Sequence, residues 1–337
     1  MYLNKANPHY IIDLKGGIYM YEDLVKHLDY IDDLSLISKA YYVASKLHKG
    51  QVRDSLEDYI THPVKVAKII ASMHGDEESI CASLLHDTLE DTDFTKEDIE
   101  REFGFNIAFL VDGVTKERKS VFSNSLERNI YNSNKLSLYS SQDIRVMVIK
   151  LSDRLHNMSS LEYKNEESII ENSTETMNFY VPVSNLLGMQ KMKRNLEDLA
   201  FKYLNNEEYE KILCIRKGIL DYSKINYLKD KIFNYMKYAG INGKVHVKYD
   251  GVMESYFKIK NGIDKLFTVY AIIDGKYKLP FKDSLVKVVS LDEFNFLENG
   301  ITSSFESINE TYKSLNLNDE LLSLNSNYTN HLAGGGL

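Results

Sequence analysis

Residues 76–92 place four side chains of metal-binding types at the end of an apolar helical pattern. The segment opens with an aspartate that follows a glycine, which suits an N-cap, and its isoleucine and leucine residues recur at helical spacing. On one helix His86 and Glu90 lie a turn apart, as do Asp87 and Asp91. An imidazole beside three carboxylates can bind a divalent cation and handle its water. A solvated, acidic helix end is the alternative interpretation.

Two other helical segments supply matching side chains. His62 precedes Pro63, a residue that suits the first turn of the apolar helix that follows. Far downstream, residues 143–158 begin with an apolar run and then place Asp153 and Asn157 on one helical face. A charge that follows a buried run is costly unless it is paired or bound to a metal. The order His, His-Asp and Asp, each on its own helix, resembles the ligand pattern of the HD phosphohydrolase superfamily.

Longer motifs make the resemblance more specific within residues 35–215. In chain order they read His48-Lys-Gly-Gln51-Val-Arg53-Asp-Ser55, Tyr59-Ile-Thr-His62-Pro63, Leu84-Leu-His-Asp-Thr-Leu-Glu-Asp-Thr92, Leu110-Val-Asp-Gly-Val-Thr-Lys116 and Lys150-Leu-Ser-Asp-Arg-Leu-His-Asn-Met158. Through these motifs the chain resembles the hydrolase domain of the RelA/SpoT homologue family. The resemblance implies a manganese-dependent enzyme that removes the 3′-diphosphate from the alarmones ppGpp and pppGpp, leaving GDP or GTP and pyrophosphate.

The resemblance also assigns roles to single residues. The implied metal ligands are His62, His86, Asp87 and Asp153, and the implied pair that positions and deprotonates water is Glu90 and Asp91. The implied substrate-binding residues are Arg53, Ser55 and Asn157, to which the bases Lys150 and Arg154 are added because they are near Asp153 in the sequence. The competing interpretations are hydrogen-bonded core residues for the ligands, a solvated helix end for the water-activating pair and a surface-loop arginine for Arg53. His156 is interpreted as a supporting histidine.

The overall fold class expected is mainly α, with an all-helical HD-domain bundle followed by a smaller α/β or α+β domain. The predicted boundaries are residues 1–205 for the bundle, 206–240 for connecting helices, 241–322 for the second domain and 323–337 for a flexible tail. Strands are expected where Val245, Val247 and Tyr249 alternate, over residues 266–273 with a turn at Asp274-Gly275, and over residues 285–289.

In position, the second domain resembles the family's alarmone synthetase domain, in a degenerate form. It lacks the Gly-Arg and Ser-Ile elements that hold ATP in the family. Thr268 stands where the family has an acidic magnesium ligand, and Ile301 and Phe305 stand where it has a tyrosine and a histidine. A hydrolase without synthetase activity is therefore expected.

Charge and composition limit the partners. The net charge of −8 disfavours a protein that coats nucleic acid, so the bases near the site must reverse the potential locally for a phosphorylated nucleotide. No apolar run predicts a membrane span or a leader sequence, and the two cysteines are expected as buried thiols. A cytoplasmic protein whose partner is a guanine nucleotide alarmone is the prediction, with homo-oligomerisation left open.

Departures from the family motifs leave the substrate open. Asp54 stands where the family usually has a basic residue, residues 56–58 replace its Gly-Glu-Pro, and Ser160 replaces a threonine. These changes affect recognition of the base and phosphates and leave the metal chemistry intact. The alternatives are an HD phosphohydrolase of another phosphorylated nucleotide and a non-catalytic alarmone-binding regulator. The Glu90-Asp91 pair argues against the regulator, because a sensor has no need of a water activator.

Overall fold

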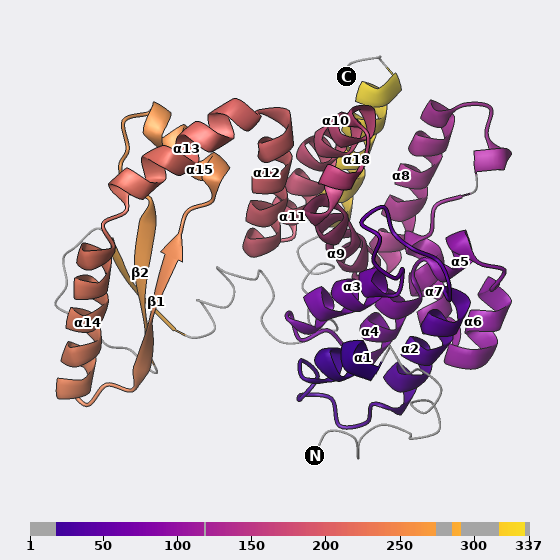
Figure 1. The fold of residues 1–337 in the computed structure, drawn as a ribbon, viewed down its shortest axis with the longest axis horizontal. Helices are drawn as coiled ribbons and strands as arrows, with labels where there is room; N and C mark the ends of the chain where they lie inside the picture. Colours follow the sequence, from indigo (N-terminus) through magenta and orange to yellow (C-terminus); the bar gives the residue numbers. More distant parts are fainter. Residues whose placement is uncertain (1–17, 118, 274–284, 291–316, 334–337) are drawn as a thin grey trace.

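The computed structural model describes residues 18–117, 119–273, 285–290 and 317–333. Two regions are visible in Figure 1, a helical body and a smaller region built on a three-stranded sheet. The helices of the body are α1 (Ile18–Val25), α2 (Ser35–Leu47), α3 (Thr61–Ala71), α4 (Glu77–Leu85), α5 (Thr88–Asp91), α6 (Lys96–Phe103), α7 (Phe105–Val114), α8 (Ser125–Gln142), α9 (Arg145–Ser159), α10 (Glu166–Glu175), α11 (Val181–Leu186), α12 (Gln190–Leu204) and α18 (Leu317–Ala333). The predicted fold class is confirmed.

Side-chain caps fix where several of these helices begin. The Asp76 carboxylate accepts a hydrogen bond from the Ser79 amide at 2.8 Å, which confirms the predicted start of α4. At α6, Thr95 and Asp98 form a capping box, in which each side chain accepts a hydrogen bond from the other residue's amide. Such caps satisfy amide groups that have no partner inside the helix.

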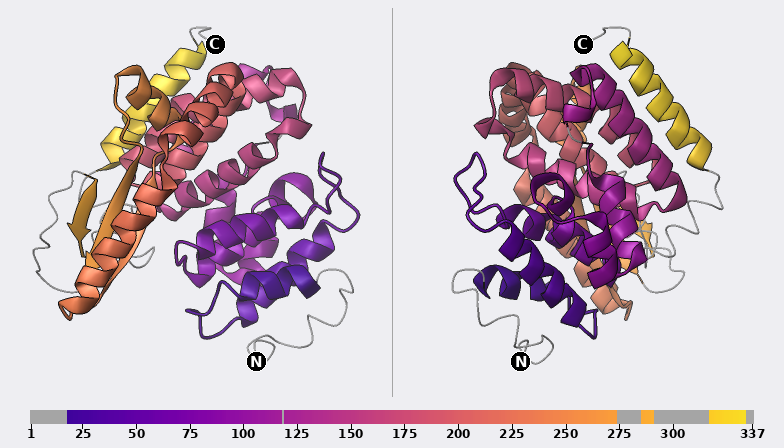
Figure 2. Two further views of the ribbon diagram at one scale, coloured as in Figure 1. Left: turned by 60° about the vertical axis from the view of Figure 1, so that its left-hand side comes forward. Right: turned by 90° about the vertical axis from the view of Figure 1, so that its right-hand side faces the viewer.

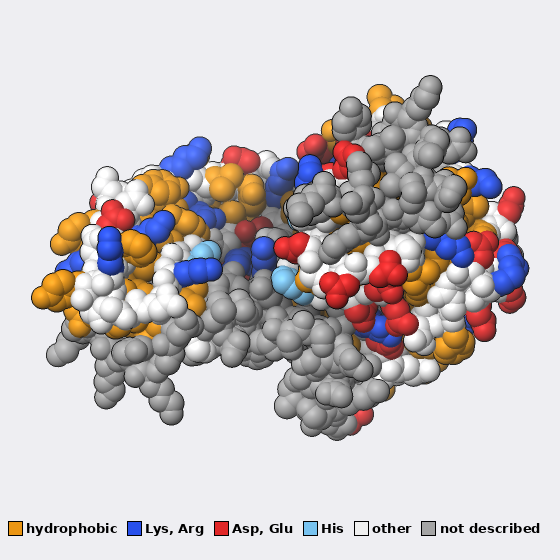
Figure 3. Space-filling model, turned by 90° about the horizontal axis from the view of Figure 1, so that it is seen from below, with side chains coloured by type: hydrophobic (Ala, Val, Ile, Leu, Met, Phe, Trp, Pro, Cys, Tyr) orange, Lys and Arg blue, Asp and Glu red, His pale blue; other side chains and the backbone are white. Residues whose placement is uncertain are grey.

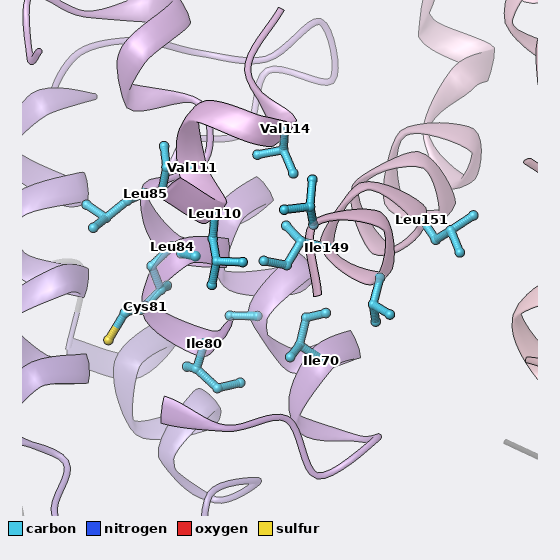
Figure 4. Packing of buried hydrophobic residues seen from close by; sticks show 14 of the residues in the cluster. Ile70, Ile80, Cys81, Leu84, Leu85, Leu110, Val111, Val114, Ile149 and Leu151 are labelled. Atoms are coloured by element: carbon cyan, nitrogen blue, oxygen red, sulfur yellow. The ribbon is translucent and has the colours of Figure 1, made fainter. Parts of the chain in front are cut away.

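The core of the body lies between α3, α4, α7 and α9, and Figure 4 shows its packing. Ile70, Leu84, Leu110 and Ile149, one from each helix, are fully buried. Burial of each such side chain contributes roughly 1.5–3 kcal/mol. Helix α9 contacts α3, α4, α7, α8 and α12, which explains why its first turns are apolar on nearly every side. The central position of α9 also carries its polar last turns into the interior.

The last described segment corrects the prediction of a flexible tail from residue 323. Residues 317–333 form α18, which packs beside α8, as the right-hand view of Figure 2 shows, and also contacts α11. Leu321 is fully buried, and the Tyr328 ring lies 5.1 Å from the ring of Phe179. Asn325 bonds to Ser133 and donates to the Asn134 amide oxygen at 2.8 Å. The prediction failed because the apolar stripe is short and its partners lie almost two hundred residues away.

In its described residues, the smaller region contains three helices and the sheet. Helices α13 (Asn206–Ile219), α14 (Tyr222–Tyr238) and α15 (Val252–Lys260) accompany strands β1 (Gly243–Tyr249), β2 (Phe267–Ile273) and β3 (Val286–Val289). Strand β2 pairs antiparallel with β1 and parallel with β3, so all three predicted strands are confirmed. On one face, α14 places Ile232 and Met236 against Val269, Ala271 and Ile273 of β2.

Three expectations for this region fall outside the described residues: the turn at Asp274-Gly275 and the positions of Ile301 and Phe305. Thr268 lies on β2 opposite Lys248 of β1. The predicted boundaries of the helical, connecting and second domains stay predictions.

One irregular turn and one smaller correction concern the rest of the chain. A π-helical turn, η5 (Thr176–Tyr180), separates α10 from α11. Of the two cysteines expected to be buried, Cys81 is buried and Cys214 is exposed, because it lies on the outer face of α13. Among the described residues, the helices are all too short or too polar to cross a membrane.

Candidate metal and active site

Four donor atoms converge in the interior of the helical body. The Nε2 atom of His62 lies 3.1 Å from His86 Nε2, 3.3 Å from Asp87 Oδ2 and 3.2 Å from Asp153 Oδ1. His62, His86 and Asp153 are buried, and Asp87 is only partly exposed. His62 comes from the first turn of α3, His86 and Asp87 from the junction of α4 and α5, and Asp153 from α9. The structure therefore brings together all four predicted metal ligands.

The junction between α4 and α5 differs from the single helix expected over this stretch. Helix α4 ends at Leu85 and α5 begins at Thr88, whose hydroxyl donates to the Leu85 carbonyl at 2.6 Å. On a regular helix, adjacent side chains point about 100° apart. The break at this junction lets His86 and Asp87 face the same cluster, with 3.2 Å between His86 Nε2 and Asp87 Oδ1.

Each histidine is held by a partner on its outer nitrogen. Nδ1 of His86 lies 2.8 Å from the Ser83 carbonyl, so it carries the proton and leaves Nε2 facing the cluster. Nδ1 of His62 lies 2.6 Å from Nδ1 of His156. Burial and the neighbouring His62 lower the pKa of His156 to about 3, which keeps it neutral. The expected supporting role of His156 agrees with this contact.

The charges of the cluster are strongly coupled. Burial alone would lower the pKa of His86, but Asp87 and Asp153 outweigh it and raise that pKa to about 9. Burial likewise opposes ionisation of Asp153, yet Lys150 and the two histidines hold its pKa well below the usual range. The carboxylates thus attract positive charge, which protons on the imidazoles or a cation can supply. Metal binding releases such protons.

The donor set fits a divalent transition ion. Two imidazole nitrogens and two carboxylate oxygens suit a cation of intermediate hardness. The contacts of the outer nitrogens with Ser83 and His156 are the supports that orient metal-binding histidines in proteins. His62, His86 and Asp87 by themselves offer donor atoms within 4.8 Å of one another.

Glu90 and Asp91 lie on α5, beside the cluster. Both line a cavity of 350 Å³, here called the metal-side cavity, together with His62, Asp87 and Asp153. Burial raises the pKa of Glu90, while Lys150 and Lys116 act in the opposite direction. A glutamate with a raised pKa is a stronger proton acceptor.

Tyr59 is a residue whose role the sequence did not reveal, although it lies within one of the motifs. Its hydroxyl lies 2.9 Å from Asp87 Oδ2 and 2.7 Å from Asp91 Oδ2. Burial and these two carboxylates raise the pKa of Tyr59, so the hydroxyl stays protonated. Because a hydroxyl has a single proton, it donates to one carboxylate at a time. Tyr59 therefore links a candidate ligand to the candidate water-activating pair.

The predicted nucleotide-binding residues form a chain of contacts toward the cluster. Arg53 Nη2 donates to Asn157 Oδ1 at 3.1 Å, and Asn157 Nδ2 donates to Asp153 Oδ1 at 2.6 Å. These residues line a cavity of 420 Å³, here called the nucleotide-side cavity. Ser55 is partly exposed and lines the same cavity, and Asp54 pairs with Lys164 at 2.5 Å.

Lys150 and Arg154 lie differently from each other. Lys150 Nζ donates to Asp153 Oδ2 at 2.9 Å and lines both cavities. The guanidinium of Arg154 bonds Asn172 at 2.8 Å and Glu175 at 2.5 Å and lies over the Tyr180 ring. Arg154 follows Asp153 directly, so helical geometry turns it about 100° away toward α10. Its guanidinium is thus occupied by the protein, although the residue borders the nucleotide-side cavity.

The chain is similar in sequence to several known proteins. Residues 40–190 match the family model described as "HD domain". A Myxococcus xanthus protein named "GTP pyrophosphokinase" is 40% identical over 238 residues, which cover 69% of this chain and 31% of that protein. A Haemophilus influenzae protein named "Guanosine-3′,5′-bis(diphosphate) 3′-pyrophosphohydrolase" is 38% identical over 219 residues, covering 64% of this chain and 32% of that protein.

A solved structure described as a metazoan orthologue of SpoT aligns with 50% of this chain and 96% of its own, at 23% identity and a TM-score of 0.40, too low to support an inference. The aligned part of this chain spans about a third of the length of the two curated relatives. Residues 40–190 thus match an HD domain, and over about two thirds of its length the chain is similar to these two curated relatives.

Proposed function

We propose that this chain removes the 3′-diphosphate of (p)ppGpp with the help of one bound divalent ion, Mn²⁺, giving GDP or GTP and pyrophosphate. The observation that carries the proposal is the convergence of two imidazoles and two carboxylates in a buried cluster that borders two cavities lined by Arg53, Lys116 and Lys150. The name of the Haemophilus relative describes the same reaction for that protein.

The residues divide the chemistry among them. A divalent ion held by His62, His86, Asp87 and Asp153 would supply Lewis acidity to the phosphate and lower the pKa of water. Glu90 accepts a proton from the attacking water, whose oxygen bonds to the phosphorus attached to the ribose 3′-oxygen. The bond between that phosphorus and the 3′-oxygen breaks, the 3′-oxygen takes up a proton, and pyrophosphate leaves.

Other residues position the reactants. Asp91, which the Tyr59 hydroxyl contacts at 2.7 Å, lies beside the cluster and helps Glu90 to position the attacking water. Arg53 offers a planar pair of donors to a phosphate, and Asn157 stands between Arg53 and Asp153 where the ribose must lie. Ser55 contacts the nucleotide from the rim of its cavity.

The pairing of Asp54 supports a guanine alarmone in spite of the altered loop. At about 4 Å, an uncompensated charge would repel a phosphate by about 4 kcal/mol at an effective dielectric constant of 20. Here Lys164 lies 2.5 Å from the Asp54 carboxylate and offsets that charge, with both side chains about half exposed. Screening by solvent reduces the effect further.

Absence of synthesis is part of the same proposal. At position 268 on β2 the chain has a threonine, whose neutral hydroxyl cannot replace a carboxylate as a magnesium ligand. We therefore assign the smaller region to a degenerate synthetase domain. Cytoplasmic location and homo-oligomerisation stay predictions.

Turnover of a nucleotide panel tests the proposal. The Mn²⁺-loaded protein is incubated with ppGpp, pppGpp, an adenine-based alarmone and a 2′-phosphorylated dinucleotide, and products are separated by anion exchange. We expect ppGpp and pppGpp to yield equimolar pyrophosphate, with no product after chelation. If the protein cleaved only another nucleotide, the proposed substrate would be wrong and the proposed metal centre would stand. If it bound ppGpp without cleaving it, it would be a sensor and not an enzyme for ppGpp.

A further inference from the structure

A third cavity lies behind the site, between the end of α7, α8, α10 and α18. Its volume is 330 Å³, and Asn129, Arg128 and Tyr328 are among the residues that line it. We call it the rear cavity. Lys116 and Lys150 line this cavity as well as the metal-side and nucleotide-side cavities. The two ammonium groups therefore stand where the three cavities adjoin.

The two lysines differ in their partners. Lys150 is engaged by Asp153 at 2.9 Å and lies 3.5 Å from the Val114 carbonyl. Lys116 is only partly exposed, and its ammonium has no hydrogen bond or ion pair to any residue in the described part of the chain. An ammonium withdrawn from water is costly without an anionic partner. Lys116 is thus a cation whose position calls for an anion from outside the protein.

The walls of the rear cavity also favour a small anion. Arg128 approaches Glu90 at 3.5 Å and donates through Nε to the Glu117 carbonyl at 2.8 Å, which leaves Nη1 free of any hydrogen bond to the described residues. Of the acidic residues that line the cavity, Glu175 is paired with Arg154 and Glu171 is exposed. The inner end therefore carries a net positive charge.

The proposed reaction supplies such an anion. In the proposed function the nucleoside occupies the nucleotide-side cavity, with Arg53 and Asn157, and the scissile phosphorus lies at the metal cluster. The second phosphate of the 3′-diphosphate must then extend away from the nucleoside, and Lys116 stands on the side that leads to the rear cavity.

We propose that Lys116 binds the distal phosphate of the 3′-diphosphate and that the rear cavity is a subsite for the released pyrophosphate. This inference rests on the proposed function and adds a second phosphate-binding point to it. A charge-assisted hydrogen bond of this kind corresponds to about tenfold or more in affinity.

Binding of inorganic pyrophosphate to the Mn²⁺-loaded protein tests the inference by calorimetry. We expect Lys116→Met to weaken pyrophosphate binding about tenfold or more. Its metal content and its affinity for GDP should stay the same, and Lys116→Arg should restore most of the pyrophosphate affinity. Lys191→Met is the matched control, because Lys191 is an exposed lysine of α12. Asn129→Phe, which fills the rear cavity from α8, should also weaken pyrophosphate binding.

The outcomes separate the inference from the function on which it rests. Equal pyrophosphate affinity of the wild-type protein and Lys116→Met would overturn the inference, because the ion alone would then bind the anion. Loss of metal from Lys116→Met would also overturn it and give Lys116 a structural role. Wild-type protein that fails to cleave ppGpp would refute the proposed function, while the pyrophosphate titration would still decide the role of Lys116.

Discussion

The helical body and the sheet region bury charge in different ways. In the body, Asp153 lies among His62, His86 and Lys150, with cavities on more than one side. In the sheet region, Asp250 is buried to the same extent, with 6% of its surface exposed, and its carboxylate contacts Lys258 at 2.6 Å. Asp250 borders none of the cavities described above.

The comparison shows that a buried carboxylate is by itself no sign of a site. Asp250 has a single dominant partner, and the backbone around it is held by Arg216, which donates to the Asp250 carbonyl at 2.8 Å. Such a pair holds α13, β1 and α15 together. Asp153 instead shares its oxygens with several donors that could be displaced by one cation. Convergence of donors on a cavity distinguishes the chemical site from the structural pair.

The two regions also differ in the charges on their surfaces. Seen from below in Figure 3, acidic side chains gather on the helical body, whereas lysine and arginine side chains stand out on the sheet region. The chain as a whole carries a net charge of −8, so the bases near the site are important for attracting a phosphorylated nucleotide. Arg53, Lys116 and Lys150 must therefore supply the attraction within the cavities.

The largest expected effect on turnover comes from replacing each of the two buried aspartates, in two separate variants, with asparagine. Asp153→Asn should reduce ppGpp hydrolysis to background. Even mutation of a residue that only hydrogen-bonds to a metal ligand lowers metal affinity or activity about 10–100-fold. Asp250→Asn removes the same charge from a lysine pair and should leave turnover unchanged. Steady-state hydrolysis and thermal unfolding are measured for both. Equal loss of turnover in the two variants would mean that stability, and not metal binding, explains the effect.

The next effect is that of Glu90→Gln, which keeps the size of the side chain but cannot accept the proton. We expect turnover to fall about a hundredfold or more, with metal content retained. Glu197→Gln is the control, because Glu197 also has a pKa raised by burial but lies on α12, paired with Lys193. A Glu90→Gln variant that loses its metal would identify Glu90 as a ligand.

A smaller effect concerns the pH dependence of turnover. Burial raises the pKa of Glu90, and a proton acceptor works only when ionised, so turnover should fall as the pH drops through that raised pKa. Lys150 and Lys116 favour the ionised form. Removing one of them, in Lys116→Met, should therefore move the acid limb of the kcat profile to higher pH. An unchanged limb would show that Glu90 is not the group that titrates.

The smallest effect on turnover is expected from the core of the sheet region. Ile149 of α9 and Ile232 of α14 are both fully buried, so their replacement by alanine should lower the free energy of unfolding by a similar amount, about 2–5 kcal/mol. Below the unfolding transition, Ile232→Ala should still bind Mn²⁺ and hydrolyse ppGpp. Urea unfolding and metal content measure the two quantities. Loss of metal from folded Ile232→Ala would contradict this prediction. It would show that the packing of the sheet region affects the metal cluster, although the two regions have separate cores.

Much of the arrangement follows from local patterns in the sequence. The start of α4 at Asp76 and the three strands were predicted because caps and periodicity are local properties. The convergence of the four candidate ligands was predicted only through the family resemblance. Their spacing along the chain does not specify how α3, α4 and α9 pack.

The predictions that failed share a physical cause: the features concerned depend on tertiary contacts, which local sequence patterns do not specify. The break after Leu85 depends on what His86 and Asp87 face in the folded protein. Helix α18 depends on Phe179 and Ser133, far away in the sequence. Arg154, added as a neighbour of Asp153, could have been placed on another face by helical geometry alone.

Titration of metal-free protein with Mn²⁺, followed by electron paramagnetic resonance, tests the buried histidine–aspartate cluster most directly. The cluster predicts one tightly bound ion per chain in the wild-type protein and none in His86→Ala. His246→Ala, which removes an exposed histidine of β1, should bind like the wild-type protein. Equally tight binding by His86→Ala and the wild-type protein would contradict the assignment of the metal centre, and the proposed hydrolysis with it.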